Sequence, residues 1–183
     1  MEPVSVLFVC LGNICRSPMA EGVFQHFTKP KNGPHHPLIA RIDSCGTGAY
    51  HVGDAPDSRT MSTLEDNGIT TYKHKARKFQ INDFTTFDYI MAMDEDNLDH
   101  LVRLRKRALK QNNTQDQELG RVMLFGDFGG KEGEEVMDPY YGARDGFEIA
   151  YEQMVRFTNG FLGILEEQAA ATGQQPNGEK SGL

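Results

Sequence analysis

A cysteine and an arginine stand with five residues between them near the start of the chain, in the segment Cys10-Leu11-Gly12-Asn13-Ile14-Cys15-Arg16-Ser17-Pro18. A thiolate is a strong nucleophile at neutral pH, and a guanidinium can hold two oxygens of a phosphate. A thiolate beneath a bound phosphate can attack the phosphorus in line and form a phosphocysteine. The spacing therefore indicates a catalytic oxyanion-binding loop. The alternative is a half-buried structural cysteine beside a surface arginine, because so short a pattern also arises by chance.

The flanking residues predict the elements that would position this loop. The apolar run before it is typical of a buried strand, which we expect over Val4 to Cys10. Ser17 is expected to cap a helix that runs to Thr28, with Pro18 at its first position. One face of this helix carries Met19, Ala20, Val23, Phe24 and Phe27. Inward N–H groups and the positive helix end favour the thiolate form of Cys10.

The rest of the chain alternates apolar runs with helical patterns. Further strands are expected over Leu38 to Ser44, Tyr89 to Met93 and Val122 to Phe125, and helices after Asp57, after Asp94 and from Asp145 to Gln168. This alternation predicts an α/β fold: a single domain with a four-stranded parallel sheet, helices on both faces, and the phosphate-binding loop between strand 1 and helix 1. We expect residues 1–168 to form this domain.

Two segments are expected to lie outside the packed domain. Residues Lys106 to Gly120 are basic and then amide-rich, which indicates a mobile surface extension. The tail from Ala169 to Leu183 is small, polar and contains glycine and proline, so we expect it to be disordered.

The bulk composition limits the class of protein. The 183 residues are 38% hydrophobic and 25% charged, as in an ordinary globular domain. The formal net charge of −7 argues against a nucleic-acid-binding protein, which normally shows a basic face. No apolar stretch is long enough for a membrane span, and Met1-Glu2-Pro3 does not begin a secretory signal. We therefore expect a cytoplasmic protein.

A proton donor for the leaving group is the second requirement of phosphate ester cleavage. Asp138 follows the last expected strand, in Met137-Asp138-Pro139-Tyr140-Tyr141-Gly142. Ligands of open α/β sheets bind at the carboxyl ends of the strands, so this carboxyl group is placed to act there. Without the cysteine motif, a simple turn would be the better interpretation of Asp-Pro and Tyr-Gly.

Together these segments resemble the low molecular weight protein tyrosine phosphatases. The similarity runs from about Val4 to Leu165. It includes the cysteine segment, Asp138-Pro139-Tyr140-Tyr141, Asp43-Ser44-Cys45-Gly46-Thr47, His74-Lys75-Ala76-Arg77, Phe87-Asp88-Tyr89-Ile90 and Met93-Asp94-Glu95-Asp96-Asn97-Leu98. The resemblance implies a metal-independent, cysteine-dependent hydrolase of phosphotyrosine and small aryl phosphates, with acid phosphatase activity and no cofactor. It also implies inhibition by phosphate, vanadate and similar oxyanions.

The resemblance further implies a role for each site residue. Cys10 would be the nucleophile, Arg16 would bind the phosphate, and Asp138 would be the general acid and then the base. The loop Leu11, Gly12, Asn13, Ile14, Cys15 and Arg16 would bind phosphate, supported by Asn13, Ser17, Ser44 and His74. Without the family, His74 would be an exposed polar residue and Ser44 an ordinary strand end.

The three cysteines are too few for a disulfide scaffold and lack the C-x-x-C spacing of a zinc site. Cys15 lies in the same loop as Cys10, and the family carries this pair. Oxidation could therefore join them reversibly and protect Cys10, although Cys15 could also simply pack beneath the loop. Cys45 is expected to be a small buried apolar residue.

Substrate recognition is expected from an apolar rim formed by Leu11, Ile14, Tyr50, Tyr140 and Tyr141, with His51 tuning preference. The tyrosines at 140 and 141 could also be phosphorylated in the manner of the family. Two other functions remain. An arsenate reductase on the same fold would need more cysteines outside the loop than Cys45 alone. A non-enzymatic phosphoprotein-binding module or redox sensor would not need the full set of Cys10, Arg16 and Asp138.

Overall fold

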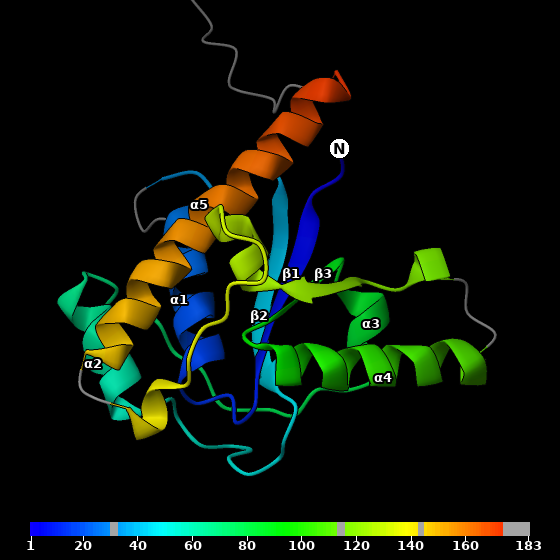
Figure 1. The fold of residues 1–183 in the computed structure, drawn as a ribbon. Helices are drawn as coiled ribbons and strands as arrows, with labels where there is room; N and C mark the ends of the chain where they lie inside the picture. The colour runs from blue at the N-terminus through cyan, green and yellow to red at the C-terminus, as the bar shows by residue number, and fades with distance from the viewer. Residues whose placement is uncertain (30–32, 113–115, 143–144, 174–183) are drawn as a thin grey trace, which may run out of the picture.

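The chain forms a four-stranded parallel sheet flanked by helices (Figure 1). The computed structural model describes residues 1–29, 33–112, 116–142 and 145–173. The strands are β1 (Val4–Cys10), β2 (Ile39–Gly46), β3 (Tyr89–Ala92) and β4 (Arg121–Leu124), in the spatial order β2-β1-β3-β4. The helices are α1 (Arg16–Thr28), α2 (Ser58–Asp66), α3 (Asp83–Thr86), α4 (Glu95–Asn112) and α5 (Gly146–Ala171), with short 3-10 turns η1 (Asp116–Glu118), η2 (Phe125–Gly129) and η3 (Pro139–Tyr141). The predicted fold class is confirmed.

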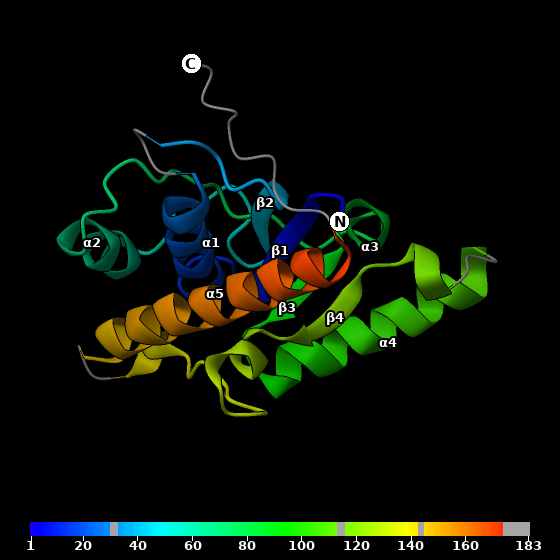
Figure 2. The same cartoon turned by 90° about the horizontal axis from the view of Figure 1, so that it is seen from above.

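The central strand β1 explains why the sheet is covered on both sides. Alternate residues of β1 point to opposite faces, and nearly all of them are buried. Val6 and Phe8 join a core with α1 and α5, whereas Leu7 and Val9 join a second core with α3 and α4. Figure 2 shows α1 and α5 on one side of the strands and α4 on the other. This arrangement leaves the carboxyl end of β1 open for the loop that follows.

The start of α1 differs from the prediction. The helix begins at Arg16 rather than after Ser17, and Cys15 occupies the N-cap position without a side-chain hydrogen bond. Ser17 is fully buried inside the first turn, where its hydroxyl group faces Cys10. The capping preference of serine was outweighed because the hydroxyl group has buried partners within the loop. Pro18 still lies in the first turn, where a missing N–H costs nothing.

Three further expectations were wrong in part. Residues Lys106–Asn112 are not a loose extension but the last turns of α4, and η1 beyond them is held by Arg105, which donates to Asp116 and to Gly120. Phe27 lies on the exposed side of α1. The helix α5 continues three residues into the expected tail, because Ala169 packs in the core. Residues 174–183 of that tail lie outside the described residues.

Three predicted helix ends are confirmed. Asp57 accepts a hydrogen bond from the Arg59 N–H at the start of α2, and Gly68 ends the following turn with a φ of 82°. Asp94 accepts one from the Asn97 N–H at the start of α4. Asp94 thereby fixes the first turn of α4 beside the carboxyl end of β3.

Candidate active site

The Cys10–Arg16 loop curls around the sulfur of Cys10. Asn13 has a φ of 57°, in the left-handed region that asparagine tolerates better than most residues. This conformation turns its N–H toward the Cys10 Sγ, 3.2 Å away. Cys10 is only 3% exposed and lies at the floor of a cavity of about 330 Å³. The thiol is therefore reached through one pocket, and the positive end of α1 points at it.

Ser17 provides a second contact to the same sulfur. Its Oγ lies 3.0 Å from the Cys10 Sγ, and it accepts a hydrogen bond of 2.9 Å from the Asn13 Nδ2. Because the amide already donates to this oxygen, the hydroxyl hydrogen can go either to the sulfur or to the Cys45 carbonyl oxygen, 3.4 Å away. A hydrogen bond to the sulfur stabilises the thiolate over the thiol.

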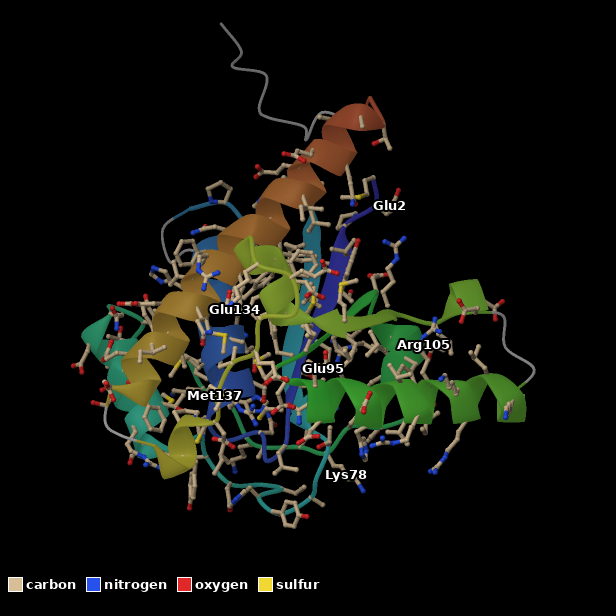
Figure 3. All side chains as sticks on the ribbon, viewed as in Figure 1. Glu2, Lys78, Glu95, Arg105, Glu134 and Met137 are labelled. Carbon is tan, nitrogen blue, oxygen red and sulfur yellow. The ribbon has the colours of Figure 1, made fainter. Side chains whose placement is uncertain are left out.

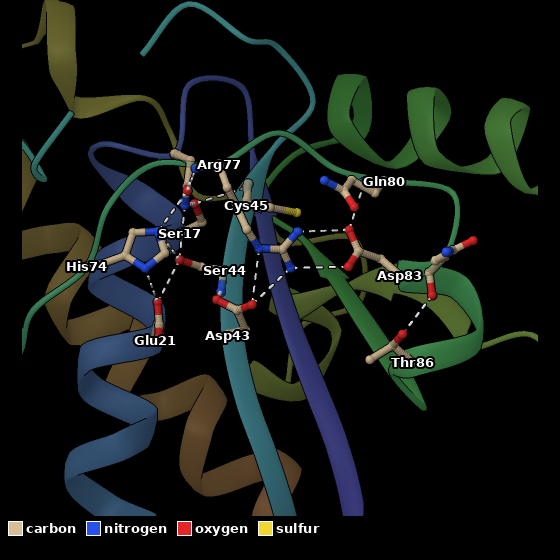
Figure 4. A network of polar contacts seen from close by, with 12 residues as sticks. Ser17, Glu21, Asp43, Ser44, Cys45, His74, Arg77, Gln80, Asp83 and Thr86 are labelled. Carbon is tan, nitrogen blue, oxygen red and sulfur yellow. Dashed lines mark hydrogen bonds and ion pairs between the residues drawn. The ribbon is translucent and has the colours of Figure 1, made fainter. Parts of the chain in front are cut away.

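Behind the loop lies a buried network of polar contacts around Ser17, Ser44 and His74 (Figure 4), and it fixes the side chain of Asn13. Its Nδ2 also donates to the Ser44 Oγ at 3.0 Å. Its Oδ1 accepts from the Arg77 N–H at 2.9 Å and faces the His74 Nε2 at 2.8 Å. All of the donors and acceptors of this amide are thus used, which holds Asn13 in its unusual backbone conformation. The structure brings together the four residues expected to support the loop.

Glu21 completes this network, and the sequence analysis missed it. Its Oε2 accepts from the Ser44 Oγ at 2.7 Å and from the Tyr72 hydroxyl at 2.8 Å, and it lies 3.3 Å from the His74 Nδ1. Burial raises the pKa of Glu21 to about 7, although the bonds from Ser44 and Tyr72 oppose this shift. A glutamate one turn into an otherwise apolar helix face, four residues after Ser17, was the signal available in the sequence.

His74 and Glu21 share one proton between them. The Asn13 Oδ1 already accepts from a backbone N–H, so the His74 Nε2 must donate to it. The Nδ1 of the same ring then faces the carboxyl group of Glu21 across 3.3 Å. Burial and the charge of Arg77 lower the pKa of His74, whereas Asp43 raises it, so below about pH 7 we place the shared proton on Glu21. The pair is then uncharged, which suits its burial.

On the open side of the loop, Arg16 joins two carboxyl groups. Its Nη1 donates to the Asp94 Oδ2 at 2.5 Å and to the Val136 carbonyl oxygen at 3.0 Å, and its Nη2 lies 3.4 Å from the Asp138 Oδ2. Arg16 is 4% exposed, whereas the side chain of Asp138 is 37% exposed. Asp94 was predicted only as a helix cap. In the structure it also holds the guanidinium group in the wall of the pocket.

The segment that carries Asp138 is attached to α2 by Arg59, a residue that the sequence analysis did not single out. The Arg59 Nη1 donates to the Tyr140 carbonyl oxygen at 3.2 Å, and its guanidinium lies 5.1 Å from the Tyr140 ring centre and 4.7 Å from that of Phe147. Asp57 binds the same guanidinium and donates its N–H to the Ile14 carbonyl oxygen. This chain of contacts links the acid-bearing segment to the Cys10–Arg16 loop.

Five of the six residues expected to form the substrate rim line the pocket. Its lining includes Leu11, Ile14, Tyr50, His51 and Tyr140. His51 lies against Gly12, where an added Cβ would be 3.2 Å from its Cδ2, and its Nδ1 lies 3.2 Å from the Asp54 Oδ2. The side chain of Tyr141 lies outside the described part of the chain.

The other two cysteines, Cys15 and Cys45, are also buried. Burial, with smaller contributions from Asp57 and Cys10, raises the pKa of Cys15 to about 12. Burial raises the pKa of Cys45 still more clearly, and this side chain is fully enclosed, as predicted. Both are therefore protonated thiols at neutral pH.

One group of side chains has the donor atoms of a metal site. Glu21, Asp43 and His74 place ligand atoms within 4.8 Å of one another. Each donor is engaged in the hydrogen bonds described above or, for Asp43, with Arg77 at 3.0 Å and the Ser44 N–H at 2.8 Å. These hydrogen bonds and the ion pair with Arg77 explain why the three side chains lie together without a bound metal ion.

The fold and this arrangement define an α/β protein with a cysteine–arginine oxyanion loop after its first strand. Comparison with known proteins then identifies the family. Residues 5–171 match the family model of the low molecular weight phosphotyrosine protein phosphatases. The chain is 48% identical over 163 residues to the Schizosaccharomyces pombe phosphatase of that name, covering 87% of this chain and 95% of the relative, and 41% identical over 158 residues to the human one, covering 86% and 93%. The chain belongs to this family.

Solved structures agree with this assignment. The Entamoeba histolytica protein tyrosine phosphatase with Hepes in its active site superposes with a TM-score of 0.75 and 34% identity, covering 90% of this chain and 98% of that one. A Drosophila arginine phosphatase superposes with a TM-score of 0.74 and 32% identity, covering 87% and 96%. Among the described residues, no helix has the length and apolar character of a membrane span.

Proposed function

We propose that this protein hydrolyses phosphotyrosine and small aryl phosphate monoesters through a phosphocysteine on Cys10. The observation that carries the proposal is the position of the Cys10 Sγ at the floor of the pocket, 3.2 Å from the Asn13 nitrogen and 3.0 Å from the Ser17 Oγ. Both contacts hold the sulfur in place at the pocket where it would meet phosphorus. The apolar rim is suited to the aromatic ring of the substrate.

In the first step the Cys10 thiolate attacks phosphorus and the bond to the ester oxygen breaks. Arg16 binds two oxygens of the transferring group and stabilises the charge that develops on it. Asp138 gives its proton to the departing phenolate oxygen. This transfer leaves the phosphoryl group on sulfur and a carboxylate at Asp138.

In the second step water attacks the phosphocysteine. The Asp138 carboxylate takes a proton from this water, and the phosphorus–sulfur bond breaks. Ser17 donates its hydroxyl hydrogen to the leaving thiolate, while the rear network keeps Asn13 in place. The two steps balance with these side chains and water alone, so we propose that no metal ion or cofactor takes part. Chelators should leave the activity unchanged, and phosphate or vanadate should inhibit it.

A rapid-quench experiment with labelled phosphotyrosine tests this proposal. The label should appear on the protein within the first turnover, and mapping should place it on Cys10. A label elsewhere, or turnover without any labelled protein, would remove the phosphocysteine from the mechanism. Phosphoarginine serves as the competing substrate because an arginine phosphatase has the same fold. Faster turnover of phosphoarginine than of phosphotyrosine would replace the proposed substrate class.

Reversible oxidation is a second part of the proposal. Peroxide would convert the Cys10 thiolate to a sulfenic acid, and the Cys15 thiol would then displace water to form a disulfide. The high pKa of Cys15, about 12, makes this second step slow at neutral pH. Mass spectrometry after peroxide treatment should find the Cys10–Cys15 linkage, and a thiol should restore activity. All three cysteines are free thiols in the structure, which supports a cytoplasmic location.

A further inference from the structure

A cluster of positive side chains lies beside α4, outside the groups that the proposed function uses. Arg103 and Arg107 are exposed on successive turns of α4, with His100 one turn before Arg103. Lys78 is exposed on the neighbouring segment, and Figure 3 shows it below α4, on the side of the sheet where β1 ends. We call Lys78, Arg103 and Arg107 the basic patch.

All three cations of the basic patch lie near enough to His100 to affect its pKa. Burial lowers the pKa of His100, and Arg103, Lys78 and Arg107 each add to this effect. In the part of the chain that the structure describes, the patch has one ion pair, between Arg103 and Asp99 at 4.0 Å. Like charges four residues apart on a helix, as at Arg103 and Arg107, are unfavourable. The patch thus holds positive charge that the folded protein leaves almost uncompensated, on a chain with a net charge of −7.

Strand pairing gives the distance between Lys78, one member of the patch, and the nucleophile. Cys10 pairs with Gly46 across β1 and β2, and Gly46 in turn forms a parallel bridge with Lys78. Two strand spacings place the Lys78 backbone about 10 Å from that of Cys10. An extended peptide advances roughly 3.3 Å per residue. Residues some three to five positions from a bound phosphotyrosine therefore reach Lys78.

We propose that the basic patch binds acidic side chains of phosphoprotein substrates, about three to five positions from the phosphotyrosine. The inference rests on the proposed function of the Cys10–Arg16 loop. Elsewhere the net negative charge of the protein repels an acidic segment, so the patch also fixes the direction in which such a substrate lies. Because exposed ion pairs are individually weak, the patch adjusts substrate preference and encounter rate rather than the chemical step.

Matched substrates and variants test the proposal. The variant Lys78→Gln/Arg103→Gln/Arg107→Gln is compared with the control Lys29→Gln/Lys73→Gln/Lys131→Gln, which loses the same charge away from the patch. Each is assayed with p-nitrophenyl phosphate and with two phosphotyrosine peptides, which carry either glutamates or glutamines at the third to fifth positions on both sides. In the unaltered protein and in the control, kcat/KM should be about three- to tenfold higher for the glutamate peptide at low salt.

The patch variant should lose this preference and keep its activity toward p-nitrophenyl phosphate. High salt should remove the preference from the unaltered protein as well, because it screens exposed charges. An equal ratio of the two peptides in the unaltered protein and the patch variant overturns the proposal. A loss of binding to phosphatidylserine vesicles with no change in that ratio also overturns it, and assigns the patch to lipid instead.

If the proposed function itself is wrong, the assay gives a different result from any of these. In that case the unaltered protein does not turn over p-nitrophenyl phosphate at all. If the triple variant alone loses this basal activity, the single variant Arg107→Gln, on the turn furthest from the loop, replaces it in the same comparison.

Discussion

The two sides of the Cys10–Arg16 loop are held by different physical means. On the open side, Arg16 contacts the carboxyl groups of Asp94 and Asp138, and Asp138 is more than one-third exposed. On the rear side, Asn13 is fixed by neutral hydrogen bonds that lead through Ser44 to Glu21, all of them buried. The open side can therefore exchange partners when a phosphate enters, whereas the rear side has no solvent to replace a lost bond.

The open side of the loop is therefore suited to the reaction, and the rear side is suited to holding the loop in place. Arg16 must give up part of its contact with the two carboxyl groups in order to bind an anion, and the partly exposed Asp138 can exchange this contact for one with solvent. The rear network has complete hydrogen bonding, and an incomplete buried network would cost more than an apolar one. Variants on the open side should change the rate, and variants at the rear should change stability and its dependence on pH.

The largest loss of activity is expected when the Cys10 sulfur, which lies between the two sides of the loop, is replaced. Cys10→Ser replaces the proposed sulfur nucleophile with a hydroxyl group, which is a much weaker nucleophile. Hydrolysis of p-nitrophenyl phosphate should fall by about 10⁴- to 10⁶-fold, as when other enzymes lose their nucleophile. Circular dichroism and phosphate binding should remain close to those of the unaltered protein. Normal turnover by this variant would contradict the assignment of the nucleophile.

A smaller loss is expected when only the open side is changed. Arg16→Lys keeps the charge but loses the fork that holds two phosphate oxygens. The value of kcat should fall by about 10²- to 10³-fold, the usual cost of removing a donor to a developing oxyanion. The melting temperature serves as the control for packing, because Arg16 also donates to the Val136 carbonyl oxygen. A change in KM without a change in kcat would show that Arg16 binds substrate and transition state equally.

The effect of Asp138→Asn should depend on the leaving group. An alkyl phosphate with a poor leaving group needs the proton, so its kcat should fall by about 10²- to 10⁴-fold. An activated aryl phosphate should lose much less in the first step. An equal loss for both substrates would argue against Asp138 as the proton donor. The structure places this group beside Arg16, so the variant Asp94→Asn distinguishes loss of the acid from loss of the ion pair.

The sequence predicted the open side better than the rear. Cys10 and Arg16 were found because their spacing alone suggests chemistry, and the apolar run before them predicted β1. Glu21 and Arg59 could not be found in this way, because their partners Tyr72 and Tyr140 lie 51 and 81 residues further along the chain. The serine at position 17 was misplaced for a related reason: local capping preference was outweighed by the sulfur and amide that the fold brings to it.

The smallest effect is expected for Glu21→Gln. This variant changes only the rear side, and it should alter how the free energy of unfolding depends on pH. The pKa of Glu21 is about 7 in the folded protein against 4.5 in a solvated chain. The folded state therefore keeps a proton that the unfolded state loses, and the free energy of unfolding falls as pH rises from about 4.5 to about 7. The variant cannot ionise and should lack this fall, which is on the order of 2–3 kcal/mol.

Urea unfolding at pH 5 and pH 8 measures this difference. The lowered pKa of His74 acts in the opposite direction, since its folded state releases a proton first, but His74 is present in both proteins and its contribution largely cancels. Glu65→Gln, an exposed carboxyl group on α2, is the matched control and should leave the pH dependence unchanged. A constant difference between Glu21→Gln and the unaltered protein at the two pH values would mean that Glu21 is ionised and His74 carries the proton. The rear side would then be held by a buried ion pair, and the contrast between the two sides of the loop would disappear.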